Sequence, residues 1–107
     1  MVAGVIADAR MSAVNFAEVV SYLTHAGVPP ADIAEMLTPL PMVVIDADSE
    51  LAWMVGRLRK TTAAAGLSLG DRFCLALAIR EHAAAWTADR SWRSISAQVD
   101  AEIVVIR

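Results

Sequence analysis

The chain has 107 residues, the size of one domain, of which 57% are hydrophobic and 20% are charged. This balance predicts a packed core and excludes a disordered chain. The formal net charge of −3 excludes a global positive field, so nucleic acid would have to be bound through local arginines or a bound metal ion. The large apolar share also predicts a surface that a partner protein covers or that forms a homodimer.

No apolar run reaches the roughly 18 residues that a membrane span needs, and the N-terminus lacks the charged leader and cleavage site of a signal peptide. We therefore expect a cytoplasmic protein that does not enter a membrane. The one cysteine, Cys74, lies inside the apolar run FCLALAI, without a second cysteine for an internal disulfide and without metal-ligand spacing around it. We expect its side chain to be a small, buried hydrophobic group.

Periodicity and turn residues divide the chain into alternating helical and extended segments. The predicted helices cover residues 13–25, 31–37, 48–66 and 68–79. The predicted strands cover residues 9–12, 41–46, 84–89 and 101–107, with a brief turn at residues 90–94 before the last of them. Strands separated by helices indicate an α/β domain with a mostly parallel sheet.

Three carboxylates lie at junctions or early helix turns of these predicted elements. Glu18 belongs to the motif SAVNFAEVV, Asp71 to LSLGDRFCLALA and Asp89 to TADRSW. Because sites gather at the carboxyl ends of parallel strands, we expect the fold to bring the three acids together. Mg²⁺ and Mn²⁺ prefer oxygen ligands and offset the cost of crowding negative charges. The pattern therefore predicts a hard-cation site and metal-assisted phosphodiester hydrolysis.

Each acid also has a structural interpretation. Ser68 and Asp71 have the Ser-x-x-acid spacing of a capping box, which alone would account for Asp71. Asp89 fits a turn residue or the N-cap of the segment after it. Glu18 and Asn15 are three residues apart on one face of an apolar helix, where burial of the carboxylate would need compensation. The conjunction of the three positions favours a site over three unrelated structural roles.

The three motifs, in this order and with these gaps, resemble the PIN-domain ribonucleases of the VapC toxin type, from type II toxin–antitoxin systems. The resemblance runs from about Arg10 to Arg107, nearly the whole chain. It implies one PIN-like domain over residues 1–107, with a three-layer α/β/α architecture around a mostly parallel sheet. It further implies a Mg²⁺- or Mn²⁺-dependent endoribonuclease that hydrolyses RNA and is neutralised by a cognate antitoxin protein.

The resemblance also assigns roles to individual residues. Glu18, Asp71 and Asp89 correspond to the metal-site acids of the family. Thr87 resembles the hydroxyl residue that helps to orient metal-bound water, which would make it part of the catalytic set. By their positions, Asn15 and Ser68 are expected to support the metal ligands through hydrogen bonds.

Arg72 and Arg90 adjoin two of the acids and are candidate phosphate contacts, the alternative being that both are solvated surface residues. We expect the RNA to be single-stranded or looped, because a shallow acidic groove reads backbone and exposed bases rather than a duplex. Trp53, Trp86 and Trp92 are expected in the core or at a dimer face, with base stacking left open for Trp92.

The chain departs from the family at its N-terminus. The family carries a further aspartate on a central first strand well before the SAVN motif, whereas only eleven residues precede Ser12. We expect that strand and the helix after it to be absent, which would leave the neighbouring strands with unpaired edges. The segment VAGVIADA then resembles the end of the lost helix, with Asp8 as a surface or cap residue.

This departure leaves two functions open. Either the start of the reading frame is misplaced and the protein is the endoribonuclease, or the chain is a catalytically inactive remnant that acts only as a protein-interaction module. A third use of clustered aspartates, a phospho-acceptor signalling domain, is disfavoured because Lys60 is the one lysine and does not lie near the end of a late strand.

Overall fold

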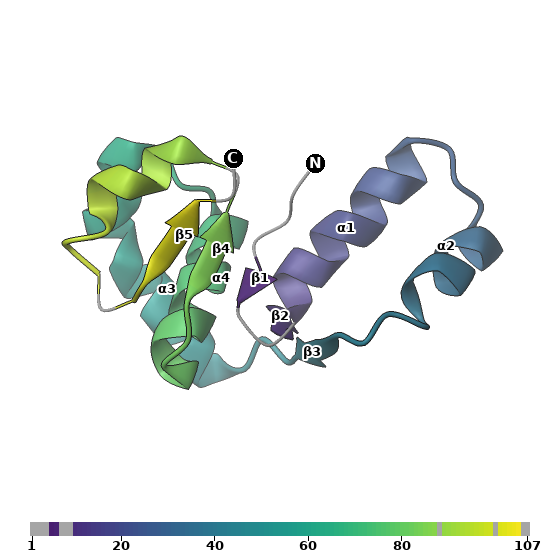
Figure 1. Ribbon diagram of the computed structural model, residues 1–107, viewed down its shortest axis with the longest axis horizontal. Coiled ribbons are helices and arrows are strands. Elements are labelled where there is room, and N and C mark those ends of the chain that lie inside the picture. The colour runs from purple at the N-terminus through teal and green to yellow at the C-terminus, as the bar shows by residue number, and fades with distance from the viewer. Residues whose placement is uncertain (1–4, 7–9, 88, 100, 106–107) are drawn as a thin grey trace.

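The computed structural model describes residues 5–6, 10–87, 89–99 and 101–105. In chain order the elements are β1 (Val5–Ile6), β2 (Arg10–Ser12), α1 (Ala13–His25), α2 (Pro30–Leu37), β3 (Val43–Ile45), α3 (Ser49–Thr62), the short 3₁₀ helix η2 (Ala63–Ala65), α4 (Leu69–Glu81), β4 (Ala85–Thr87), the 3₁₀ helix η3 (Arg90–Ile95) and β5 (Ile103–Val105). Figure 1 shows α1 and α2 toward one end of the molecule's long axis and α3, α4, β4 and β5 toward the other. The architecture is the expected PIN-like α/β fold.

The five strands form one sheet in the order β3-β2-β1-β4-β5. β2 pairs in parallel with β3, and β4 pairs in parallel with β5. β1 lies between these two pairs and is antiparallel to both of its neighbours. β2, β3, β4 and β5 therefore run in one direction, as a mostly parallel sheet requires, and their carboxyl ends meet at one edge.

The central strand β1 corrects two expectations. The sequence predicts a helix end at residues 5–6 and unpaired edges on the strands beside it. Instead, β1 is paired opposite Arg10 on β2 and opposite Ala85 and Trp86 on β4. Both predictions are wrong because a two-residue strand is defined by its neighbours in the sheet, which local sequence does not reveal. Asp8, expected as a surface or cap residue, lies outside the described residues.

The two helices of the core begin where side-chain caps predict. The Asp48 carboxylate accepts a hydrogen bond of 2.9 Å from the Leu51 amide, which satisfies a free donor at the start of α3. Ser68 and Asp71 form the capping box at the start of α4, with both reciprocal hydrogen bonds present. These helix starts are confirmed because they depend on local signals alone.

The hydrophobic core surrounds α4. Residues 72–78 of this helix are all buried, and the entirely buried Leu51 adds a side chain from the facing helix α3. Trp92 of η3 is only 1% exposed, which confirms it as a core residue and leaves no ring face for a base. Trp53 and Trp86, in contrast, are 69% and 42% exposed. Burial of residues 72–78 on every side of the helix explains why this part of α4 is mainly apolar.

No single helix within the described ranges is long and apolar enough to span a membrane. α3 with η2, residues Ser49–Ala65, and α4 together reach the length and composition of a span, but they are bent by 119° relative to each other. The turn between them contains Gly66, whose φ of +71° lies in the left-handed region.

Candidate functional site

A buried polar network holds Glu18 at the junction of α1 and α4. The Asn15 side-chain amide donates hydrogen bonds to the Glu18 carboxylate over 3.1 Å and to the Gly70 carbonyl over 2.8 Å. The Ser12 hydroxyl in turn donates to the Asn15 side-chain carbonyl over 2.5 Å, which fixes the orientation of the amide. Ser12 and Asn15 are each 1% exposed, whereas Glu18 is exposed. The buried network therefore holds an accessible carboxylate in place. Asn15 makes the hydrogen bond to Glu18 that was expected of it.

Gly70 makes this approach of the two helices possible. A Cβ added to Gly70 would overlap the carboxylate of Glu18. Because Gly70 has no side chain, the Glu18 carboxylate can lie against its backbone. The Gly70 carbonyl accepts the hydrogen bond from Asn15. Sequence reasoning singled out neither Ser12 nor Gly70 as a functional residue. A glycine in the first turn of an otherwise apolar helix is the signal that would have identified Gly70.

Asp71 follows Gly70 directly and has the capping role that the sequence left open. Its Oδ2 atom accepts a 2.9 Å hydrogen bond from the Ser68 amide, and its own amide donates to the Ser68 hydroxyl over 3.2 Å. Within the described part of the chain, the other carboxylate oxygen accepts no hydrogen bond. Capping therefore uses one oxygen of Asp71, and the second remains available to another ligand.

The negative charges of Glu18 and Asp71 both influence the buried thiol of Cys74. Burial raises the pKa of Cys74 to about 12, with further contributions from the negative charges of Asp71 and Glu18. The Glu18 carboxylate lies against Gly70, the residue before Asp71, so the two acids from different helices lie in the same region of the molecule. The thiol itself is protonated at neutral pH and is 1% exposed, as expected for a small core residue.

Asp89 lies beyond the carboxyl end of β4 and caps η3. Its carboxylate accepts a 2.9 Å hydrogen bond from the Ser91 amide, which lowers the pKa of Asp89 and keeps the group ionised. Its backbone amide donates to the hydroxyl of the buried Thr87 over 3.0 Å. The N-cap interpretation of Asp89 is confirmed, and Thr87 orients the backbone at the point where this acid leaves the sheet.

The three acids share one edge of the sheet but do not form one cluster. β2 and β4 run in the same direction, so Ser12 and Thr87 end their strands at this edge. Among the described residues, however, no three His, Cys, Asp or Glu side chains come close enough to hold one metal ion. Asp71 and Asp89 each have a carboxylate oxygen that accepts a hydrogen bond from a backbone amide, of Ser68 and of Ser91 respectively.

The two arginines predicted as phosphate contacts differ in position. Arg72 is 8% exposed, and its guanidinium donates a 3.0 Å hydrogen bond to the Val55 carbonyl of α3. It therefore connects α4 to α3, and its burial contradicts the alternative of a solvated surface residue. Arg90, the first residue of η3, is exposed beside Asp89. Of the two arginines, Arg90 is therefore the more accessible to a ligand.

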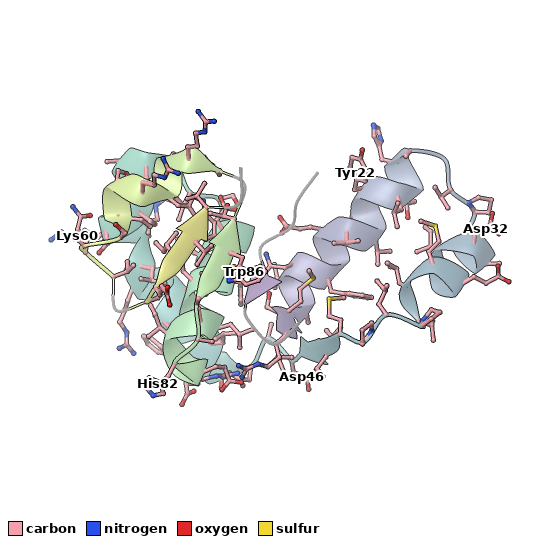
Figure 2. All side chains as sticks on the ribbon, viewed as in Figure 1. Tyr22, Asp32, Asp46, Lys60, His82 and Trp86 are labelled. Atoms are coloured by element: carbon pink, nitrogen blue, oxygen red, sulfur yellow. The ribbon has the colours of Figure 1, made fainter. Side chains whose placement is uncertain are left out.

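Charge is divided unevenly along the chain. Residues 11–56 contain six carboxylates and neither lysine nor arginine. Residues 57–107 contain eight of the nine basic residues. Figure 2 shows the separation, with Asp32 at the α1–α2 end of the molecule and Lys60 at the opposite end. Basic residues therefore lie mainly on the part of the chain that follows residue 56.

Comparison with known proteins agrees with this geometry. The PIN-domain family matches residues 2–98, and the chain belongs to this family. No curated protein and no solved structure matches the chain. PIN domains are generally nucleases that bind RNA and typically use divalent metal ions, so a nuclease-type function is the general expectation for this protein.

The acids of this chain fit such a metal ion in chemistry and only partly in arrangement. Carboxylate oxygens are the ligands that Mg²⁺ and Mn²⁺ prefer. Glu18 and the second oxygen of Asp71 supply two such donors in one region, whereas the described residues do not add a third to the group. Any ion held here would keep several water ligands, which is common for Mg²⁺ in proteins.

Proposed function

We propose that the protein is a Mg²⁺- or Mn²⁺-dependent endoribonuclease toxin of the VapC type, which acts on RNA in the cytoplasm and is neutralised by a cognate antitoxin. The observation that carries the proposal is the accessible Glu18 carboxylate, held by Asn15 and Gly70 next to Asp71. Membership of the PIN-domain family supports the nuclease chemistry. An exposed acid supported by a buried network is more typical of a site than of a solvated helix face.

Each residue of the proposed site has a defined task. Glu18 and Asp71 would hold the ion, and Asp89, at the same edge of the sheet, would complete the acidic set. A bound Mg²⁺ or Mn²⁺ ion would supply an activated water molecule and stabilise charge on the phosphate. Thr87 holds the backbone of Asp89 through the 3.0 Å hydrogen bond. Arg90 would contact a phosphate of single-stranded or looped RNA.

The direct test is cleavage of a mixed single-stranded RNA pool by the purified protein, with Mn²⁺ and with EDTA. Glu18→Gln removes the charge but keeps the shape, so we expect it to lose cleavage while its circular dichroism spectrum is unchanged. Glu35→Gln, at an exposed position of α2, is the matched control and should cleave like the natural chain. Asp71→Asn should also lose cleavage. A Glu18→Gln variant that retains full cleavage would contradict the proposed site.

The alternative is a catalytically inactive PIN-domain protein that acts only through protein interactions. One observation favours it, namely that the described residues include no group of three potential ligands around one point. An apolar pocket between α1 and α2, lined by Phe16, Val20, Ile33 and Leu37 among others, gives such a protein a surface to offer. A folded protein that neither cleaves RNA nor binds Mn²⁺ by calorimetry would establish this alternative.

A further inference from the structure

The two central helices each contain one glycine, Gly56 in α3 and Gly70 in α4. Neither has a positive φ, so the backbone conformation requires glycine at neither position. Glycine also weakens a helix relative to alanine, because it loses more conformational freedom on folding. The reason for a glycine at these positions must therefore lie in what surrounds it.

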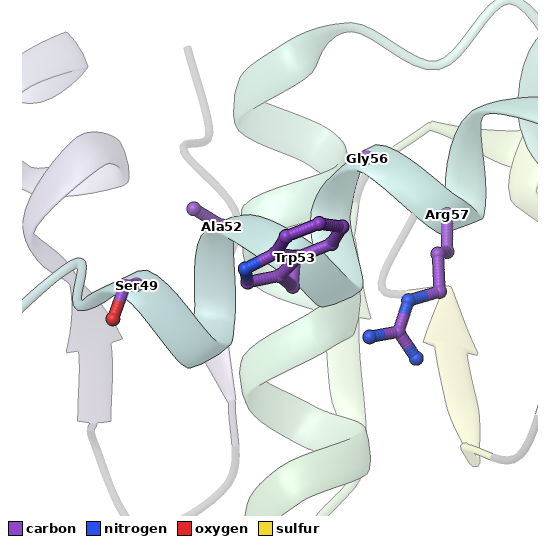
Figure 3. Close-up of a pocket in the computed structure, with 5 residues that line it drawn as sticks. All are labelled: Ser49, Ala52, Trp53, Gly56 and Arg57. Atoms are coloured by element: carbon purple, nitrogen blue, oxygen red, sulfur yellow. The ribbon is translucent and has the colours of Figure 1, made fainter.

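The surroundings of Gly56 are open. This residue is exposed on the outer side of α3, between Trp53 and Arg57 (Figure 3). Beyond its chain neighbours and the backbone of its own helix, no atom lies within 4 Å of a Cβ added here. Alanine would fit without any movement, so Gly56 is an internal reference for the effect of the same substitution at Gly70.

The surroundings of Gly70 are filled by one group. Gly70 is buried, and the three atoms nearest to a Cβ added there all belong to the carboxylate of Glu18. The carboxyl carbon would lie 2.6 Å from that Cβ, whereas ordinary contacts begin at 3.4 Å. A side chain at position 70 and the observed position of the Glu18 carboxylate therefore exclude each other.

Of the two groups, the carboxylate is the one free to move. It is the far end of a flexible, exposed side chain. The start of α4 is held by the capping box of Ser68 and Asp71, and residues 72–78 are buried in the core. An added methyl group would thus displace the carboxylate and leave the helices in place. The displacement would break the 3.1 Å hydrogen bond from the Asn15 side chain to Glu18.

We propose that Gly70 is a positioning residue for Glu18, required by the site and not by the fold. Its missing side chain leaves room for the carboxylate beside Asp71, the next residue of α4, so that the two acids can share one ion. The inference rests on the proposed metal-dependent nuclease. It implies that one methyl group at position 70 converts a metal-binding protein into an equally well folded one that binds metal poorly.

Gly70→Ala is the decisive variant, and Gly56→Ala is its matched control. Both add the same methyl group to a helix, so we expect an unchanged or raised Tm for both. Titration of the purified proteins with Mn²⁺ by calorimetry should separate them. We expect about 10–100-fold weaker binding for Gly70→Ala, the loss typical when the support of a metal ligand is removed. Gly56→Ala should bind Mn²⁺ like the natural chain.

The position of the carboxylate can also be followed without metal. Asn15 is the one asparagine of the chain and Gln98 the one glutamine, so side-chain amides give two pairs of signals in a ¹⁵N NMR spectrum. Gly70→Ala should shift the Asn15 pair toward its position in Glu18→Ala, because both variants remove the acceptor of the same hydrogen bond. Gly56→Ala should leave the pair unchanged.

Natural Mn²⁺ affinity in Gly70→Ala, or unshifted Asn15 signals, would overturn the proposal. A large fall in Tm would overturn it as well, because Gly70 would then be required by the fold. A natural chain that binds no Mn²⁺ would contradict the proposed function instead. In that case the Asn15 signals of the metal-free proteins still decide whether Gly70 positions Glu18.

Discussion

The two ends of the molecule are held together in different ways. α4 carries eight buried residues and forms the centre of the core, whereas α1 and α2 each bury only one, Asn15 and Ile33. α1 joins α4 through the polar network around Glu18, and Val14 of α1 packs against the core. The comparison teaches that the core provides the stability and that the α1–α2 hairpin contributes a positioned carboxylate at modest cost in packing.

Truncating one buried side chain in each region gives the largest expected contrast. Leu75 of α4 is 0% exposed, so we expect Leu75→Ala to lower the free energy of unfolding by about 2–5 kcal/mol. Ile33 of α2 is 7% exposed in a region that can relax around the space, so Ile33→Ala should cost about 2 kcal/mol or less. Urea denaturation measures both. Equal losses would show that the hairpin is as much a part of the core as α4.

The junction between the regions is expected to give a smaller effect. Asn15→Ala removes the donor to the buried Gly70 carbonyl and leaves the Ser12 hydroxyl without its acceptor, which should cost about 1–3 kcal/mol. Thr24→Ala is a control on the same helix, because its exposed hydroxyl donates a hydrogen bond to the Val20 carbonyl of the same helix. Denaturation of the two variants compares them. If Asn15→Ala is as mild as Thr24→Ala, the network does not hold the hairpin to the core.

The smallest expected effect is a dependence on pH at the surface of the core region. The Leu51 amide, and then Arg80, lower the pKa of Asp48 below its usual value of 3.8. A lowered pKa in the folded state means that the carboxylate stabilises the protein fully above pH 3.8 and that this stabilisation disappears as the pH falls through the lower folded value.

The measurement is Tm against pH for Asp48→Ala. The variant should melt below the natural chain at pH 7, and the two curves should converge in the acid range. Asp46→Ala, two residues earlier at an exposed position, is the matched control and should follow the natural chain throughout. A constant difference in Tm down to the lowest pH would show that the charge of Asp48 is not what stabilises α3.

The elements that the sequence predicts well are those with local signals. The helix of residues 13–25 and the caps at Asp48 and Ser68 are all observed where periodicity and capping patterns place them. The capping role of Asp71 was likewise visible in a four-residue pattern. Signals of this kind involve residues one or two helical turns apart, so no knowledge of the tertiary structure is needed.

Contacts between distant segments could not be predicted in this way. The burial of Arg72 depends on the Val55 carbonyl of another helix. The position of Glu18 depends on Gly70 of α4, which is distant from α1 in the sequence but in contact with it in the fold. The clustering of the three acids was inferred from their shared edge of the sheet, but an edge does not determine which way a carboxylate turns. For Asp89, the amide of Ser91 determines it.

The strand β1 has a consequence for how the protein is made. It is the only strand of the described sheet that joins the β2–β3 pair to the β4–β5 pair. A ribosome releases β1 well before β4, and pairing over such a separation is intrinsically slow. Until β4 emerges, the nascent chain exposes an unpaired strand edge with apolar neighbours, a state prone to aggregation. Production of this protein should therefore respond strongly to translation rate, temperature and the availability of chaperones.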